Sequence, residues 1–332
     1  MKRLMTLCAV LAVMCFAAPA MSADTVILRY SNFFPPTHVQ SKLAEEWAQE
    51  VNKRTGGEVQ VEYYPGGILT KAKQCYDGVV EGMSDVGMSA LAYSRGRFPV
   101  MAAVDLPLGY TSGVDATAVA NAVYEKFRPK AFRDVEVMYF HAHGPGLLHT
   151  AQKPVEKLED IKGLKLRATG NSGKLVKALG GTPVGMSMSD SYQAIQKGVV
   201  NGGMYPVETN KGWKMAEVVD YMTETFPVAY TTTFFVVMNK DKWNELSDKN
   251  KQIITELNKE WAVRHGQAWD ESDKVGRAYF LENGGKIIPL SDADAWKAAA
   301  APMLQEYVGM ANKKKLDGQA VLDFTVETLK AQ

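Results

Sequence analysis

A short glycine-rich phrase occurs twice in this chain, and no other feature limits its fold so strongly. Residues 81–88 read EGMSDVGM and residues 197–204 read KGVVNGGM. With an offset of 116 residues and no gaps, two glycines and one methionine coincide, and Asp85 matches Asn201. In both places the phrase follows an expected helix and leads into an expected strand. The repeat therefore indicates two similar structural units.

The apolar periodicity around each phrase supports this interpretation. The first half is predicted to contain strands at 26–31, 59–63 and 85–89, and helices at 39–55 and 75–83. The second half is predicted to contain strands at 163–169, 182–186 and 201–205, and helices at 173–181 and from about 189. A strand at 231–239 and helices at 241–279 and 291–331 follow. Two β-α-β-α-β runs favour an α/β fold with mainly parallel sheets flanked by helices.

These units suggest a two-lobed architecture, with a ligand cleft between the lobes. We expect lobe I to comprise residues 24–146 and about 233–272, and lobe II residues 147–232 and about 273–332. In parallel sheets, ligands bind beyond the carboxyl ends of the strands. A cleft between two lobes is also a preferred site for small molecules.

The first residues are typical of a secretory signal peptide. Lys2 and Arg3 precede an apolar run that extends to about Ala18, and small residues allow cleavage near 22–23. Pro19 and the polar segment after it argue against the alternative, a membrane anchor. We therefore predict that residues 1–23 are removed and that the mature protein is exported, which the resemblance described below narrows to the periplasm.

Composition excludes several kinds of partner. Cleavage would change the formal net charge from +1 to −1, so the mature chain has no basic excess for nucleic acid. Cys75 would be its single cysteine, which we interpret as a small buried side chain. No later segment is apolar enough to span a membrane. We expect a monomer without a cofactor.

The motifs of common enzymes are missing. The strings nearest to G-x-S-x-G lack the second glycine, and TGNSGK at 169–174 lacks the flanking residues of a phosphate-binding loop. HAH at 141–143 places two imidazoles on one face of a strand, but no third metal ligand has recognisable spacing. We interpret these histidines as hydrogen-bonded residues and expect a protein that is not an enzyme and holds no metal.

Arg167 is the strongest candidate for ligand recognition. It lies near the carboxyl end of the strand GLKLRAT, on the face opposite the aliphatic residues. A guanidinium there fits a carboxylate with two parallel hydrogen bonds. A salt bridge to an acid such as Glu208 is the alternative, and the spacing alone does not decide between them.

The stretch EDIKGLKLRATGNSGKLVKALGGTPVGMSMSDSYQAIQKGVVNGGMYP at 159–206 resembles the substrate-binding proteins of TRAP transporters (tripartite ATP-independent periplasmic transporters). The likeness extends through THVQSKLAEEWAQEVNKRTGGEVQVEYYPGGIL and AVDLP to most of the mature chain. It implies a receptor with the two-lobed periplasmic-binding-protein architecture, which closes over an organic acid and delivers it to membrane subunits. It also implies that Arg167 binds the ligand carboxylate.

Departures from the family pattern suggest the kind of ligand. Tyr205 stands where many relatives have a ligand-contacting asparagine, Met188 replaces a phenylalanine, and Leu147 or Leu148 stands where some relatives carry a second arginine. With Phe33 opposite, this wall favours a bulky apolar or aromatic monocarboxylate.

Lys71 would be needed for the alternative, a C4-dicarboxylate. A sensory receptor for an organic acid and a secreted enzyme are the other functions considered. The expected ligand-binding residues are Arg167, Tyr205, Met188, Phe33, Asn32, Ser89, Ala90, Leu147, Glu208, Tyr230 and Lys71.

Overall fold

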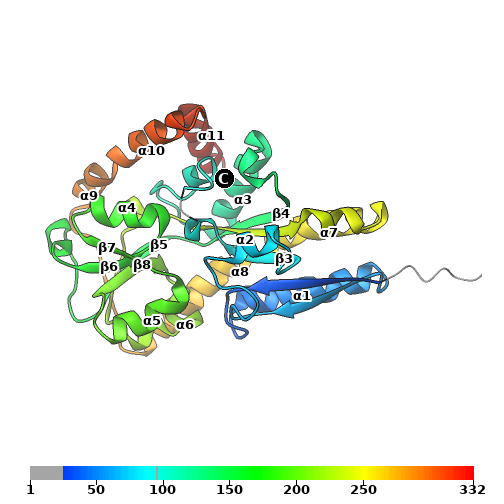
Figure 1. Cartoon of the computed structure of the whole chain (residues 1–332). Coiled ribbons are helices and arrows are strands. Elements are labelled where there is room, and N and C mark those ends of the chain that lie inside the picture. Colours follow the sequence, from blue (N-terminus) through cyan, green and yellow to red (C-terminus); the bar gives the residue numbers. More distant parts are fainter. Residues whose placement is uncertain (1–24, 95) are drawn as a thin grey trace, which may run out of the picture.

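The structure is a computed structural model that describes residues 25–94 and 96–332, so the predicted signal peptide lies outside the described residues. The strands form two separate sheets with helices packed on both faces (Figure 1). One sheet has the order β2-β1-β3-β10-β4, and the other has the order β11-β9-β5-β8-β6-β7. The predicted two-lobed α/β fold is confirmed, and we use lobe I and lobe II for the bodies built on the first and second sheets.

Lobe I is a five-stranded sheet in which one strand runs against the others. Its strands are β1 (Val26–Asn32), β2 (Val59–Tyr64), β3 (Val86–Ala90), β4 (Val135–Ala142) and β10 (Thr233–Asn239). Strand β10 is antiparallel to both of its neighbours, whereas β1 is parallel to β2 and β3. Its helices are α1 (Val39–Arg54), α2 (Cys75–Val80), α3 (Gly113–Phe127) and α7 (Lys240–Glu245). Cys75 is buried in the core, as predicted.

Lobe II follows the same plan with six strands. These are β5 (Gly146–Thr150), β6 (Lys165–Ala168), β7 (Thr182–Gly185), β8 (Gly202–Pro206), β9 (Tyr221–Thr223) and β11 (Lys286–Ile288). Strand β5 is antiparallel to β8 and β9, and the other pairs are parallel. Its helices are α4 (Gly170–Ala178), α5 (Met188–Gln196), α6 (Thr209–Gly212) and α9 (Ala293–Ala300).

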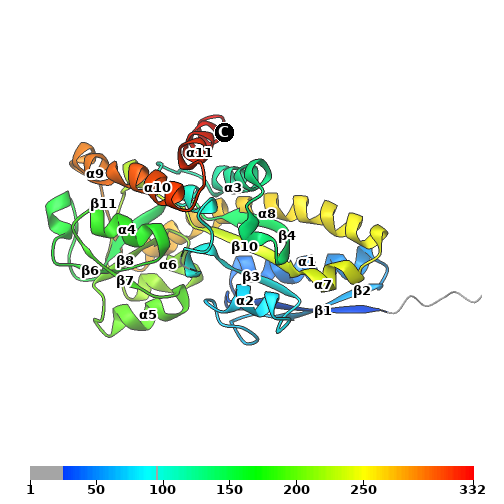
Figure 2. The same ribbon diagram turned by 45° about the horizontal axis from the view of Figure 1, so that its top comes forward.

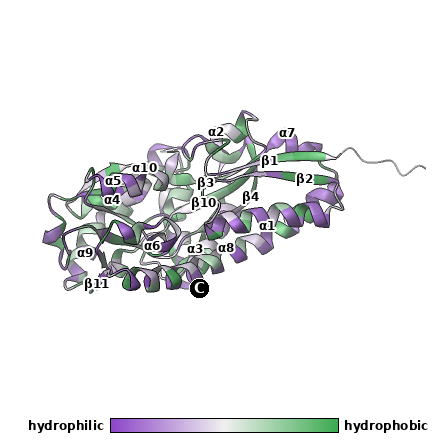
Figure 3. Cartoon of the chain, turned by 90° about the horizontal axis from the view of Figure 1, so that it is seen from below, coloured by the Kyte–Doolittle hydropathy of each residue, from purple (hydrophilic) through white to green (hydrophobic). Residues whose placement is uncertain are grey.

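Helix α8 (Asp248–Glu282) joins the lobes along most of their combined length (Figure 2). Ile254 and Trp261 are buried in the core of lobe I, and Phe280 is buried in the core of lobe II. Hydrophilic and hydrophobic residues alternate along α1 and α8 (Figure 3), so each helix buries one face and exposes the other. The cost of exposing these apolar faces keeps α8 attached to both lobes.

The predicted boundary at the C-terminus is wrong in part, because residues 273–332 do not all belong to lobe II. In helix α10 (Pro302–Lys313), Met303 packs in lobe II whereas Tyr307 packs in lobe I. Helix α11 (Gly318–Lys330) then buries Val321 and Leu322 in the core of lobe I. The chain therefore crosses back over the top of the molecule (Figure 1). Amphipathic periodicity identifies these helices but not the lobe that each one covers.

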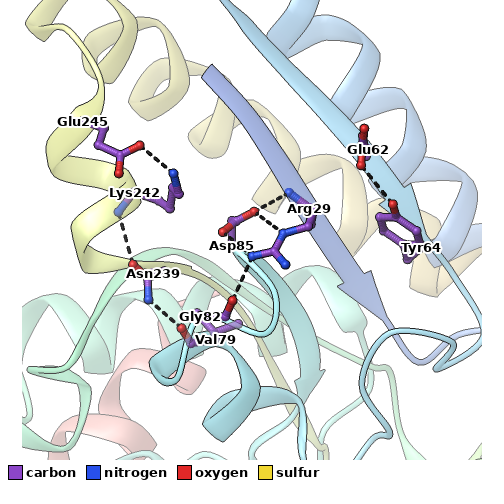
Figure 4. Close-up of polar contacts among 9 residues, drawn as sticks. All are labelled: Arg29, Glu62, Tyr64, Val79, Gly82, Asp85, Asn239, Lys242 and Glu245. Atoms are coloured by element: carbon purple, nitrogen blue, oxygen red, sulfur yellow. Dashed lines mark hydrogen bonds and ion pairs between the residues drawn. The ribbon is translucent and has the colours of Figure 1, made fainter. Parts of the chain in front are cut away.

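The repeated phrase fastens the third strand of each unit to the first. In lobe I, Asp85 Oδ2 accepts a hydrogen bond from Arg29 N at 2.7 Å, and Asp85 N donates to Arg29 O at 2.9 Å. In lobe II, Asn201 Oδ1 accepts from Lys165 N at 2.8 Å, and Asn201 N donates to Lys165 O at 2.7 Å. The Arg29 guanidinium adds further bonds to Asp85 and to the Gly82 carbonyl (Figure 4). The matched pair Asp85 and Asn201 thus has one structural role in both lobes.

The matched glycines of the two phrases also serve equivalent purposes. Gly82 and Gly198 have φ of +73° and +69°, which L side chains rarely adopt, and they turn the chain from helix to strand. Gly87 and Gly203 lie in β3 and β8, where neighbouring groups come too close for a side chain. A Cβ at Gly203 would lie 3.0 Å from Arg167 Cβ.

All five histidines of the chain are buried, and burial keeps most of them neutral. Burial lowers the pKa of His143 to about 4 and the pKa of His149 and His265 to about 3. Burial and the nearby His265 hold the pKa of His141 well below its usual range. These four side chains can be protonated more easily in the unfolded chain than in the folded protein.

We therefore predict that the free energy of unfolding falls as the pH decreases from about 6.5 toward these folded-state pKa values, because the unfolded state then binds more protons. Each neutral histidine should contribute a loss of about 2 kcal/mol between pH 7 and pH 5. Urea denaturation measures the free energy of unfolding at pH 7 and at pH 5. The loss between these two pH values should be smaller in His265→Gln than in the wild-type protein by about that amount. Lys259→Gln, which alters an exposed residue on the same helix, should lose as much as the wild-type protein. An unchanged difference in His265→Gln would contradict the prediction.

Candidate ligand-binding site

A small cavity lies between the lobes, where β1, β3, β6 and β8 end. Its volume is about 30 Å³, which is room for one or two water molecules. An organic acid therefore needs the lobes or the side chains to move before it can enter. The cavity is lined by Phe33, Phe34, Ala90, Tyr93, His143, Arg167, Thr169, Met188, Tyr205, Pro206, Glu208, Thr209, Trp213, Tyr230, Thr232, Phe234 and Trp269.

Arg167 brings an unpaired positive charge to this cavity. It is 4% exposed, its Nη1 donates to the Met204 carbonyl at 3.3 Å, and its Nε has no partner. Among the described residues, no acidic side chain forms a salt bridge with it. Glu208, which we considered as a partner, instead bonds through Oε2 to His38 Nε2 at 3.0 Å. A buried charge without a counter-ion is costly, so this guanidinium is suited to an anionic ligand.

Aromatic rings form an apolar wall of the cavity. Phe33 and Phe34 follow β1, and their ring centroids are 4.2 Å apart. Phe33 also stacks with Trp213 at 6.0 Å and with Phe234 at 6.3 Å. Phe234 in turn stacks with Trp269 at 5.3 Å. Such a cluster offers flat apolar faces to a bulky or aromatic group.

Tyr205 and Tyr230 add hydroxyl groups close to Arg167. The Tyr205 hydroxyl is buried without a hydrogen-bond partner, and its ring stacks on His149 at 4.3 Å. Burial raises the pKa of Tyr205 well above its usual value and that of Tyr230 to about 12, partly opposed by the Arg167 charge. Both phenols therefore stay neutral and can donate hydrogen bonds. The wall that we expected to favour an apolar ligand therefore also carries these two polar groups.

Seven of the eleven expected residues line the cavity, and four do not. Asn32 donates to the Tyr63 hydroxyl at 2.7 Å, and Ser89 donates to the backbone carbonyl of residue 72 at 2.7 Å. Leu147 is buried in the core of lobe II, and Lys71 is exposed to solvent. Lys71 therefore lies outside the cavity in this conformation.

Several lining residues were missed from the sequence. Trp213 follows α6, and Trp269 lies in the middle of α8. Tyr93 follows β3, but no sequence pattern singled it out. A tryptophan on a long helix gives no sign that its face borders a cavity.

The histidines of the HAH motif take part in hydrogen bonds. His141 Nδ1 accepts from Trp269 Nε1 at 3.0 Å, and His143 Nδ1 lies 2.6 Å from the Gly144 carbonyl. Within residues 25–94 and 96–332, no group of three or more His, Cys, Asp or Glu side chains could hold a metal ion.

Polar contacts hold the two lobes together around the cavity. Met188 N, in lobe II, donates to the Tyr93 hydroxyl of lobe I at 3.0 Å. Asn171 Nδ2, on α4, donates to the Ala102 carbonyl of lobe I at 2.7 Å. These bonds would break if the lobes separated, so the structure shows a closed arrangement.

A larger groove of about 540 Å³ lies between α4, the segment 91–105 and the end of α10. Lys174, Lys177 and Lys314 line it, and all three are exposed. Arg167 does not line this groove. Exposed lysines are well solvated, so the smaller cavity is the better candidate for a site that recognises one carboxylate.

Two lobes closing over a buried, charged cavity define a solute-binding protein. Residues 30–309 match the family model described as bacterial extracellular solute-binding protein, family 7, and the chain belongs to this family. A TRAP periplasmic solute-binding protein from Desulfovibrio salexigens is 38% identical, with 92% of this chain and 96% of that chain covered and a TM-score of 0.81. That structure is an open complex with the C-terminus of a symmetry mate in its ligand-binding site.

Two further solved structures show the range of the family. A marine metagenome TRAP protein specific for aromatic acids, in complex with 3-hydroxybenzoate, is 29% identical over 92% of this chain and 98% of that chain, with a TM-score of 0.88. A TRAP periplasmic solute-binding protein from Chromohalobacter salexigens with bound D-glucuronate is 22% identical, with 92% of this chain and 100% of that chain covered and a TM-score of 0.81. At this identity the similarity supports the fold alone.

The family and these relatives bind and transport substrates, and the chain is a transport receptor rather than an enzyme. Of the helices in the described residues, none has the length and apolar composition required to cross a membrane.

The lobe contacts lead to a prediction about affinity. Asn171→Ala removes one hydrogen bond that exists only when the lobes are closed, which should weaken binding of an acid by about two- to tenfold. Calorimetric titration with an acid that the wild-type protein binds would measure this. Lys177→Ala, which alters an exposed residue on the same helix, should bind the acid with wild-type affinity. Equal affinities for Asn171→Ala and wild type would show that this bond does not favour closure.

Proposed function

We propose that this protein is the periplasmic receptor of a TRAP transporter and that it delivers an organic acid to the membrane subunits. The family supports the extracytoplasmic receptor role. The observation that carries the choice of ligand class is the buried, unpaired guanidinium of Arg167 beside a cavity with an aromatic wall.

Arg167 binds the ligand carboxylate in this proposal. Its planar fork can form two parallel hydrogen bonds with a carboxylate, and the bond to the Met204 carbonyl holds the side chain in place. The hydroxyls of Tyr205 and Tyr230 lie on the same cavity and can donate to the same anion. A bound carboxylate would then supply the counter-ion that the protein lacks at this position.

The favoured ligand is a bulky apolar or aromatic monocarboxylate. The rings of Phe33, Phe34, Phe234, Trp213 and Trp269 provide the apolar surface. The 29% identical relative is described as specific for aromatic acid ligands, which supports the same class here. The chain terminus held in the Desulfovibrio site agrees with a site that accepts a carboxylate.

Two alternatives have less support. A C4-dicarboxylate or a uronate needs further cationic or polar partners, and Lys71 lies outside the cavity. A sensory receptor would use the same site, and neighbouring genes for two membrane subunits would favour transport over sensing.

The role of Arg167 can be tested by substitution. Removing one partner of a buried charged pair costs about 2–5 kcal/mol, so Arg167→Ala should bind an arylacetate roughly 30- to several-thousand-fold more weakly than wild type. Calorimetry on a variant shown by circular dichroism to be folded would measure the loss. Arg277→Ala, which removes a surface ion pair with Glu224, should bind as wild type does. Near-normal affinity in folded Arg167→Ala would rule out the carboxylate role.

The ligand class can be tested by competition. Phenylacetate should displace a bound acid at lower concentration than succinate or D-glucuronate, because a second carboxylate or several hydroxyls would be desolvated against aromatic rings. A thermal-shift assay with each acid alone should give the largest rise in melting temperature for the aromatic acid. The reason is that a ligand at 100 times its Kd adds about 2.7 kcal/mol to the stability of the folded protein. If succinate or glucuronate ranks first, the monocarboxylate proposal fails while the receptor role stands.

A further inference from the structure

A buried pair formed by His38 and Glu208 lies at the cavity, separate from Arg167. His38 precedes α1 in lobe I, and Glu208 precedes α6 in lobe II. Their side chains are 0% and 2% exposed, and His38 Nε2 lies 3.0 Å from Glu208 Oε2. Phe34 stacks on the His38 ring at 4.5 Å. The pair is therefore fixed in position where the two lobes meet.

The hydrogen bonds of His38 define its charge. Its Nδ1 accepts a bond from Gln40 N at 3.2 Å, which caps the first turn of α1. An accepting Nδ1 carries no proton, so the proton is on Nε2, which donates to Glu208. The imidazole is thus neutral and supplies a hydrogen bond but no counter-charge to the carboxylate.

Asp273 is the acidic residue next to Glu208. Asp273 Oδ1 accepts from Glu208 N at 2.8 Å, whereas Asp273 Oδ2 is buried without a partner. Burial, with Glu208 and Asp270 nearby, raises the pKa of Asp273 well above its usual value. Burial thus favours the protonated form of Asp273, and Glu208 is the acid of the two that lines the cavity.

Close packing keeps the pair from moving away from the cavity. Gly212 ends α6, directly over the pair, and a Cβ there would lie 2.9 Å from His38 Nε2 and closer still to Glu208 Oε2. Oε2 is occupied by His38, and no described residue donates to Oε1. The cavity thus has an unpaired cation at Arg167 and an anion at Glu208 with one free acceptor oxygen.

We infer that Glu208 sets the specificity of the site: its carboxylate accepts a hydrogen bond from a hydroxyl or ammonium group of the ligand and excludes acids with a second carboxylate. This inference rests on the proposed function, because it assigns the ligand carboxylate to Arg167. A monocarboxylate that also carries a donor satisfies both groups, and a hydrogen bond to a charged acceptor is stronger than a neutral one. A dicarboxylate places a like charge against a buried anion that has no counter-ion.

The test compares acids that differ by one substituent. Phenylacetate is the parent, mandelate and the three ring-hydroxylated phenylacetates add a donor, and phenylmalonate replaces the mandelate hydroxyl by a carboxylate. Wild-type protein should bind the best hydroxylated acid about tenfold or more tightly than phenylacetate, and phenylmalonate more weakly than phenylacetate. Calorimetry measures all affinities on the same protein preparation.

Glu208→Gln keeps the shape of the side chain and its acceptor for His38 but removes the charge. In this variant the advantage of the hydroxylated acid should fall to about threefold or less, and phenylmalonate should gain about tenfold relative to phenylacetate. Glu217→Gln, an acid of lobe II outside the cavity that bonds to the Tyr192 hydroxyl, is the matched control and should keep the wild-type ratios.

The outcomes separate this inference from the proposed function. If the wild-type protein binds none of these acids, the proposed aromatic-acid function fails. If it binds phenylacetate but no hydroxylated form binds more tightly, Glu208 accepts no bond from the ligand and the inference is overturned without any variant. Unchanged ratios in folded Glu208→Gln would overturn it as well.

Discussion

The pairing of the first and third strands in each repeat unit is the interaction on which the rest of the structure depends. A side-chain acceptor, Asp85 in lobe I and Asn201 in lobe II, fixes the start of the third strand to the backbone of the first. Register then follows, because a slip by one residue would turn every side chain to the opposite face. In lobe II this register sets Arg167 opposite Gly203. The position of the unpaired charge is thus a consequence of strand pairing.

The unpaired charge in turn explains why the lobes need a ligand. A guanidinium buried without a counter-ion destabilises the closed, unliganded protein, whereas a carboxylate at the same place removes that penalty. A ligand shifts the equilibrium between open and closed forms only by its different affinity for the two. In the proposed function, Arg167 from lobe II and the rings from lobe I supply this difference, since a ligand would contact both sets only when the lobes are together.

The sequence predicted the parts that depend on local patterns, and it failed where distant segments meet. Periodicity around the repeated phrase was sufficient for β1, β2, β3, β6, β7 and β8, and the resemblance pointed to Arg167. Nothing local shows that Trp269, on a helix whose other residues pack in a core, borders the cavity. The same limit applies to Val321 and Leu322, since an apolar helix face does not identify the lobe that it covers. Lys71 was selected by chain position, but its side chain is exposed.

A comparison of the two lobes shows how one scaffold yields a core in one place and a binding surface in the other. In lobe I, Ser31 pairs with Gly87, and the space beside that glycine is filled by Cys75 and Val79. In lobe II, Arg167 pairs with Gly203, and the space beside that glycine holds Arg167 Cβ and the ring of Tyr205. In lobe I, side chains of helix α2 therefore fill the space beside the third strand. In lobe II, the polar side chains of Arg167 and Tyr205 occupy the corresponding position and line the cavity. Because lobe I adds mainly aromatic rings, the proposed function would orient a ligand with its carboxylate toward lobe II and its apolar body toward lobe I.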